Sequence, residues 1–171
     1  MNHPDPKDIV RRGYDELSLR YRGDAETPPH YASWIGELSG RLGPNADVLD
    51  LGCGCGVPVA RDLSAAGHRV TGIDISDVQI ERAQRLVPGA TFVRGDATQA
   101  AFPPGSFDAV VCLYTIIHVP LDEQAPLLGR LATSLRHARH ASCRARCASC
   151  RADSARRVAS FASRLASFSA S

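Results

Sequence analysis

The stretch that decides the fold is VLDLGCGCG, residues 48–56. Its first half is an apolar run of strand type that carries one acidic residue, Asp50. Its second half has glycine at every other position, namely Gly52, Gly54 and Gly56. Glycine accepts positive φ and lacks a Cβ, so such a chain can turn sharply and approach a ligand closely. Because residues 57–66 then suit a helix, the segment predicts the first crossover of a nucleotide-binding α/β fold.

The glycine spacing distinguishes between cofactors. The dinucleotide fingerprint G-x-G-x-x-G, counted from Gly52, requires glycine where the chain has Val57. The string instead resembles motif I of the class I S-adenosylmethionine-dependent methyltransferases, an acidic residue followed by G-x-G-x-G. The residues that match are Asp50, Gly52, Gly54 and Gly56. The resemblance implies that the glycines let the main chain approach the methionine portion of S-adenosylmethionine, while Asp50 helps to orient its amino group.

The next predicted strand, residues 69–74, ends in a second acidic residue. Asp74 lies 22 residues beyond Gly52, close to the separation of about 20 at which a carboxylate meets a ribose in such crossovers. A charged acceptor there can bind both ribose hydroxyls. Ser76 and Gln79 have the spacing of a capping box for the helix that follows.

A third predicted strand, residues 90–94, leads to the adenine end of the site. In the methyltransferases that the chain resembles, an acidic residue and its neighbour's backbone hold the adenine amino group at this point, and Asp96 and Ala97 match them. The resemblance also places Ile75 and Leu113 beside the cofactor. The segment FPPGSFDAVV, residues 102–111, resembles the one that introduces the fourth strand in many members.

The fourth predicted strand, residues 109–113, is followed by the candidate acceptor residues Tyr114 and His118. With strand order 3-2-1-4, its carboxyl end faces the ligand crevice beside the first strand. A histidine titrates near neutral pH, so His118 suits a general base that deprotonates a hydroxyl or amine nucleophile. The alternative is that His118 only positions the loop or the cofactor.

Two helices are predicted before the first strand. Apolar and aromatic residues recur at helical spacing over residues 8–22, and a second pattern covers residues 31–42. In the family, an N-terminal helix with a YDxxxxxY-like pattern lies over the cofactor, and Tyr14, Asp15 and Tyr21 would be its counterparts. The alternative is that these tyrosines and Trp34 belong to the hydrophobic core.

These predictions define the fold class as α/β, with a Rossmann-like, doubly wound and mostly parallel sheet that lacks the C-terminal strands of the usual seven. Residues 1–45 form a helical cap, residues 46–136 the cofactor-binding core and residues 137–171 an atypical tail. The tail carries 7 Arg and 1 Asp and is rich in Ala and Ser. It has no strand periodicity. An unpaired fourth strand would present an exposed edge that favours self-association.

The tail also contains cysteines with C-x3-C-x2-C spacing, namely Cys143, Cys147 and Cys150. Radical S-adenosylmethionine enzymes use this spacing for an iron-sulfur cluster, but their motif lies near the N-terminus of a barrel. Adventitious zinc binding together with His137 and His140 is a second interpretation. We predict no metal site.

Other function classes fit the sequence less well. A nicotinamide-dependent oxidoreductase needs the third glycine and a catalytic Tyr-Lys pair, yet Lys7 is the only lysine. A nucleic-acid amino-methyltransferase is expected to show [DNS]PP[YF] where residues 112–115 read CLYT.

No apolar run is long enough to span a membrane and no signal sequence opens the chain, so we expect a cytoplasmic enzyme. It would methylate an O, N or C atom of a small molecule and release S-adenosylhomocysteine; the alternative is an inactive cofactor-binding or interaction fragment.

Overall fold

The computed structural model describes residues 5–21, 23–24 and 29–136, and the tail predictions lie outside them. The helices and strands for which bounds were predicted begin and end within two residues of those bounds, and one short 3-10 helix was not predicted. In chain order the elements are α1 Pro6–Tyr21, α2 Pro29–Arg41, β1 Asp47–Leu51, α3 Val59–Ala65, β2 Arg69–Asp74, α4 Asp77–Leu86, β3 Thr91–Arg94, β4 Ala109–Val111, η1 Ile116–His118 and α5 Leu121–Ser134.

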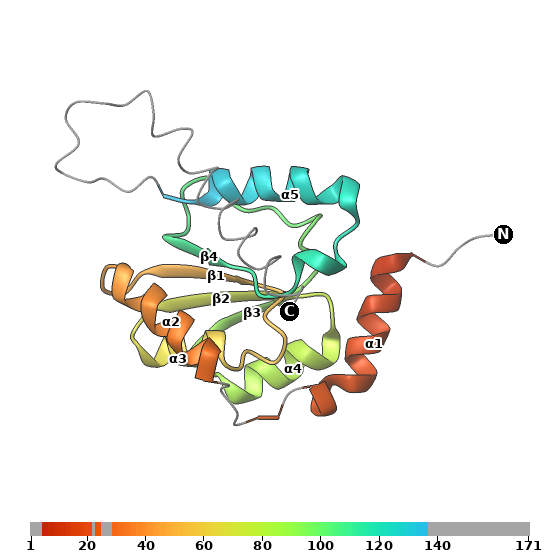
Figure 1. Cartoon of the computed structure of the whole chain (residues 1–171), viewed down its shortest axis with the longest axis horizontal. Helices are drawn as coiled ribbons and strands as arrows, with labels where there is room; N and C mark the ends of the chain where they lie inside the picture. The colour runs from red at the N-terminus through yellow and green to blue at the C-terminus, as the bar shows by residue number, and fades with distance from the viewer. Residues whose placement is uncertain (1–4, 22, 25–28, 137–171) are drawn as a thin grey trace.

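The four strands form one sheet in the order β3-β2-β1-β4, and every pairing is parallel. This confirms the predicted strand order and the α/β fold class. Helices α3 and α4 lie on one side of the sheet and α5 lies on the other (Figure 1). Since both strands that neighbour β1 run parallel to it, the carboxyl ends of the strands meet at one edge of the sheet.

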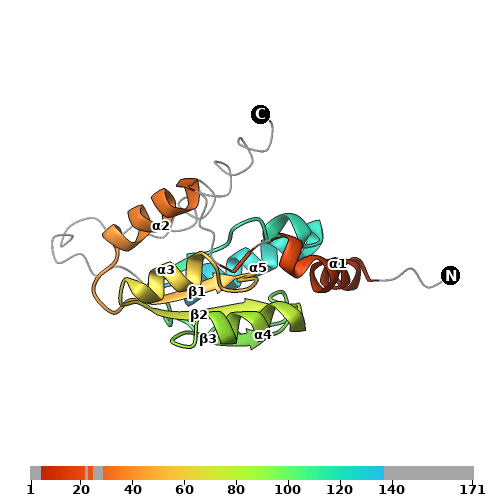
Figure 2. The same ribbon diagram turned by 90° about the horizontal axis from the view of Figure 1, so that it is seen from below.

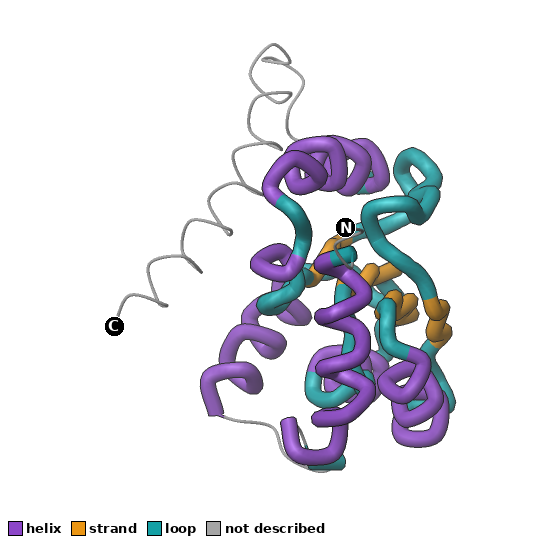
Figure 3. The backbone as a smooth tube through the Cα atoms, turned by 90° about the vertical axis from the view of Figure 1, so that its right-hand side faces the viewer, coloured by secondary structure: helices purple, strands orange, loops and turns teal. Residues whose placement is uncertain are grey.

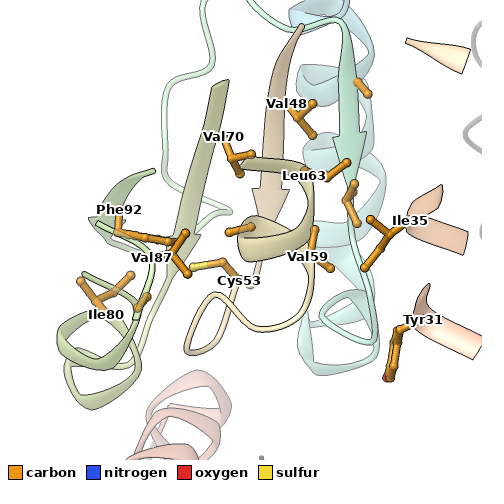
Figure 4. Packing of buried hydrophobic residues seen from close by; sticks show 14 residues of the cluster. Tyr31, Ile35, Val48, Cys53, Val59, Leu63, Val70, Ile80, Val87 and Phe92 are labelled. Atoms are coloured by element: carbon orange, nitrogen blue, oxygen red, sulfur yellow. The ribbon is translucent and has the colours of Figure 1, made fainter. Parts of the chain in front are cut away.

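Alternate residues of β1 face the two sides of the sheet, as a strand requires. Val48 packs with α3, α4 and part of α2 in one apolar cluster, which Figure 4 shows in detail. Leu49 and Leu51 pack with Ile73 and with Leu127 of α5 in the other cluster. Both faces of the sheet are therefore covered near β1, which explains why Val48, Leu49 and Leu51 are all apolar although they alternate between the two faces.

The two helices that precede β1 differ in how they are attached. Helix α2 packs Tyr31 and Ile35 into the first cluster, with Trp34 against it. Helix α1 buries a single residue, Ser18, and lies across the carboxyl ends of the strands (Figures 1 and 2). Figure 3, which views the molecule from that side, shows α1 in front of the strands. The predicted apolar stripe of α1 is not core, since Leu17 and Tyr21 are 50% and 52% exposed.

Strand β4 ends at Val111, two residues earlier than predicted. Tyr114 has φ of 64°, a left-handed conformation that is uncommon for a non-glycine residue, and it turns the chain into η1. After α5 the chain returns beside the start of β4, where Leu135 forms a parallel bridge with Phe107. The predicted open edge is thus paired at its beginning within the described residues. None of the helices among these residues is long and apolar enough to cross a membrane.

An ionic cluster joins the other ends of the strands, and it predicts a dependence of stability on pH. Asp47 binds Arg69 at 2.6 Å and Arg136 at 2.7 Å. The hydrogen bond from Arg69, aided by Arg136, lowers the pKa of Asp47 to about 2. Because this pKa is depressed in the folded state, the stabilisation is present above about pH 4 and is lost as the pH falls toward 2.

We therefore expect urea unfolding of the wild type to show a drop in stability between pH 5 and pH 2.5 that is smaller in Asp47→Asn. A drop of the same size in both proteins would contradict the role of this cluster.

Candidate functional site

One pocket lies at the carboxyl ends of the strands and is covered by α1. It contains all the predicted site residues except Gly56. Those that line it are Tyr14, Tyr21, Asp50, Gly52, Gly54, Asp74, Ile75, Asp96, Ala97, Leu113, Tyr114 and His118. They come from five separate segments of the chain, so their assembly is a property of the fold.

The three positions of the loop require glycine for different structural reasons. All have positive φ. A Cβ on Gly52 would lie 1.9 Å from Thr115 Oγ1, and one on Gly56 would lie 3.0 Å from the ring of Phe92. A Cβ on Gly54 would meet nothing closer than 4.0 Å. Gly54 is thus the glycine that leaves space for a ligand, whereas Gly56 is required by packing against β3 and lies outside the pocket lining.

Asp74 is held by the backbone on both carboxylate oxygens. Oδ2 accepts a hydrogen bond from Gly54 N and Oδ1 accepts one from Ser76 N, both at 2.9 Å. Burial raises the pKa of Asp74, although these backbone hydrogen bonds act in the opposite direction. Each oxygen keeps a further lone pair, so the carboxylate has a fixed orientation and can still accept hydrogen bonds from a ligand.

The predicted capping box forms only in part. Ser76 Oγ caps α4 by accepting from Gln79 N at 3.1 Å, whereas Ser76 N binds Asp74. The Gln79 side chain points instead into the pocket beside Gly54. Its Oε1 is buried without a hydrogen-bond partner among the described residues. An unsatisfied buried amide oxygen is costly, so Gln79 is a further candidate for contact with a ligand, which the capping pattern concealed.

Asp96, at the opposite end of the pocket, is fixed by a lysine. Its Oδ1 accepts from Thr98 N at 2.8 Å, and its Oδ2 lies 2.8 Å from Lys7 Nζ. Burial acts to raise the pKa of Asp96, but the hydrogen bonds from Lys7 and Thr98 outweigh it and the pKa is lowered. Lys7 also binds Glu123 Oε2 at 2.9 Å. Neither contact of Lys7 could be predicted from the sequence, because the two partners are 89 and 116 residues away from it.

His118 has a defined partner. Its Nε2 lies 3.0 Å from the hydroxyl oxygen of Tyr14, and the two rings meet edge to face. Burial raises the pKa of Tyr14 to about 12, so its hydroxyl is protonated at neutral pH and can donate to Nε2. His118 and Tyr14 therefore form a hydrogen-bonded pair at one end of the pocket.

All four tyrosines of the chain line this pocket, namely Tyr14, Tyr21, Tyr31 and Tyr114. Tyr14 and Tyr21 are in edge contact at 5.3 Å, and Tyr31 and Tyr114 at 6.5 Å. The two interpretations of the N-terminal aromatic residues thus divide between the helices: those of α1 face the pocket, and Tyr31 belongs to both pocket and core.

Burial changes the acidity of two thiols near the site, those of Cys53 and Cys112. Burial raises the pKa of Cys53 well above its usual range and that of Cys112 to about 11. Both thiols are protonated at neutral pH and pack as small apolar side chains. Among the described residues no group of His, Cys, Asp and Glu has an arrangement that could hold a metal ion.

Comparison with known proteins shows what kind of domain carries this pocket. The family described as "Methyltransferase domain" matches residues 48–138, which is more than half of the chain. The chain belongs to this family. The parallel sheet and the family membership confirm the predicted class, the class I S-adenosylmethionine-dependent methyltransferases, and with it S-adenosylmethionine as the cofactor of the family.

Similar proteins support the same assignment. A sterol 24-C-methyltransferase of Yarrowia lipolytica is 32% identical over 115 residues, which cover 63% of this chain and 30% of that protein. A sterol 24-C-methyltransferase of Aspergillus fumigatus is 40% identical over 79 residues, or 43% of this chain and 21% of that protein. The chain therefore spans less than a third of the length of these curated relatives.

A solved structure is similar over more of its length. Magnesium protoporphyrin IX methyltransferase from Synechocystis PCC 6803, crystallised with bound S-adenosylmethionine, is 27% identical with a TM-score of 0.63. The match covers 79% of this chain and 74% of that one.

Proposed function

We propose that this chain binds S-adenosylmethionine in the pocket below α1 and transfers its methyl group to a small, uncharged and largely apolar acceptor. The observation that carries this proposal is the assembly of the cofactor-type residues and the tyrosines in a single pocket at the carboxyl edge of a parallel sheet. S-adenosylmethionine supplies an electrophilic methyl group on a sulfonium whose departure needs little chemical assistance.

In this proposal different residues bind the methionine, ribose and adenine portions of the cofactor. Gly54 leaves room for the methionine portion, beside Asp50 on β1 and the unsatisfied amide oxygen of Gln79. Asp74 accepts the ribose hydroxyls through lone pairs that Gly54 and Ser76 leave available. Asp96 and the backbone of Ala97 hold the adenine amino group. Ile75 and Leu113 line the pocket as apolar contacts.

The acceptor class follows from charge and polarity. The pocket lining contains Asp50, Asp74 and Asp96 but one ammonium group, that of Lys7, which is bound by two carboxylates. Because Lys7 is engaged and none of the described arginines lines the pocket, the lining supplies no available cationic side chain to pair with an anionic acceptor. The tyrosine rings and Val10 offer apolar contact near His118. The names of the sterol and porphyrin methyltransferases among the similar proteins agree with a small-molecule acceptor.

Where the acceptor carries a proton, Tyr14 and His118 form the route for its removal. The acceptor proton passes to the Tyr14 oxygen while the phenolic proton passes to His118 Nε2, 3.0 Å away. Proton transfer of this kind contributes about 100-fold or more to a rate. We expect Tyr14→Phe and His118→Gln each to lower turnover by roughly that factor, with cofactor affinity changed less than about threefold.

The two residues act as a unit, so the double variant should be no slower than either single variant. The measurement is transfer of radiolabelled methyl from S-adenosylmethionine to a panel of sterols, porphyrins and small phenols and amines. Additive losses in the double variant would contradict a shared proton route. Cofactor binding without transfer to any acceptor would favour the inactive cofactor-binding fragment.

A further inference from the structure

The attachment of α1 depends on polar contacts. The helix buries only Ser18, and four of its residues make polar contacts with the rest of the protein. Lys7 binds Asp96 and Glu123. The Tyr14 hydroxyl contacts His118, and Asp15 Oδ1 accepts a hydrogen bond from Ser76 Oγ at 2.5 Å. The backbone and side-chain oxygens of Ser18 accept hydrogen bonds from Arg82 at 2.6 and 2.7 Å. Apolar burial does not fix the helix, so its position along the pocket is set by these contacts.

Lys7 supplies the contact nearest the N-terminus of α1. Its three ammonium hydrogens have three acceptors, Asp96 Oδ2 at 2.8 Å, Glu123 Oε2 at 2.9 Å and Thr98 Oγ1 at 3.2 Å. The side chain is 16% exposed. Arg130 donates to Thr98 O at 2.5 Å and ties the same loop to α5. Lys7 therefore joins α1, the loop after β3 and the first turn of α5 at one point.

Lys7 and Tyr14 share one face of α1. They are seven residues apart, which is two helical turns or about 10 Å of rise, and both line the pocket together with Val10. A displacement of Asp96 at one end of the pocket would therefore move the Tyr14 hydroxyl at the other end, if α1 moves as a rigid helix. We propose that Lys7 is a positioning residue that couples cofactor binding at Asp96 to the placement of Tyr14 against His118.

This inference rests on the proposed function, because it takes Asp96 as the adenine-binding carboxylate. Its consequence is that a bound cofactor stabilises α1 through Lys7, so the acceptor end of the pocket is ordered by an event at the adenine end. Lys7→Met removes the ammonium and keeps most of the apolar stem. Arg12→Met is the matched control, since Arg12 lies on the same helix, is largely exposed and pairs with Asp8.

The test is amide hydrogen exchange of the full chain, with and without saturating S-adenosylhomocysteine. Two regions are followed, the glycine loop over residues 52–56 and α1 over residues 8–18. In the wild type and in Arg12→Met, the ligand should slow exchange in both regions, by about tenfold in α1. In Lys7→Met it should still protect the glycine loop, while the protection of α1 falls to less than about threefold. Lys7→Arg should restore most of it.

The outcomes separate the two proposals. Full protection of α1 in Lys7→Met, or no protection of α1 in a wild type whose glycine loop is protected, would overturn the coupling and leave the proposed function intact. No protection of either region in the wild type would overturn the proposed function. If Lys7→Met does not fold, Glu123→Gln removes one charged partner of Lys7 without altering α1 or Asp96. It should give intermediate protection of α1, and unchanged protection would again contradict the coupling.

Discussion

Replacing Asp74 by alanine should weaken S-adenosylhomocysteine binding by at least about 100-fold. Two hydrogen bonds from ribose hydroxyls to a charged acceptor contribute about 3 kcal/mol or more. Their loss would be accompanied by the loss of the acceptor for Gly54 N and Ser76 N. Isothermal titration calorimetry measures the change directly.

Two variants serve as controls for Asp74→Ala. Asp77 is exposed at the start of α4 and pairs with Arg94, so Asp77→Ala should bind as the wild type does. His118→Ala should lose much less affinity than Asp74→Ala, because His118 lies at the acceptor end. Equal losses in Asp74→Ala and His118→Ala would show that the division between cofactor and acceptor residues is wrong.

Gly52→Ala should destabilise the fold by about 3 kcal/mol. The residue has φ of 70°, and its Cβ would overlap the Thr115 side chain, whose Oγ1 donates to Leu51 O at 2.8 Å. The new methyl group would push β1 and the loop after β4 apart, since the contact is between the glycine loop and a side chain fixed by that hydrogen bond. Urea denaturation of the two proteins gives the difference in the free energy of unfolding.

Gly67 provides the matched control for backbone strain alone. Its φ is 88°, and a Cβ there would meet no atom within 4 Å. Gly67→Ala should therefore cost only the left-handed conformation, about 1 kcal/mol. If Gly52→Ala and Gly67→Ala lose the same stability, the contact with Thr115 does not explain why Gly52 is glycine.

The elements of the sheet could be predicted because each has a strong local signal. The alternating glycines after an apolar run, the capping Ser76 and the carboxylate of Asp74 all act within one crossover. Parallel sheets bring successive strand ends together, so the position of the cofactor residues followed from the order of the strands. All the predicted site residues except Gly56 line the pocket, and their roles toward a cofactor stay predictions.

Other features depend on contacts between distant parts of the chain. Gly56 matches the glycine motif, but a glycine is needed there because a Cβ would lie too close to the ring of Phe92 on β3. Lys7 belongs to no motif, and its partners lie in the loop after β3 and in the first turn of α5. The spacing of Leu17 and Tyr21 predicts a helix correctly but not what the helix covers, because a face over a pocket and a face over a core have the same period.

The central claim is that the pocket below α1 is a cofactor site. Its most direct test is isothermal titration of the purified full chain with S-adenosylhomocysteine, using Gly54→Val as the reference. Gly54 borders open space in the pocket, and its N–H donates to Asp74. The valine side chain would occupy the space that we assign to the methionine portion of the cofactor. We predict micromolar binding of one ligand per wild-type chain and no detectable binding to Gly54→Val. Absence of binding to a folded wild-type chain, or equal binding to both proteins, would contradict it.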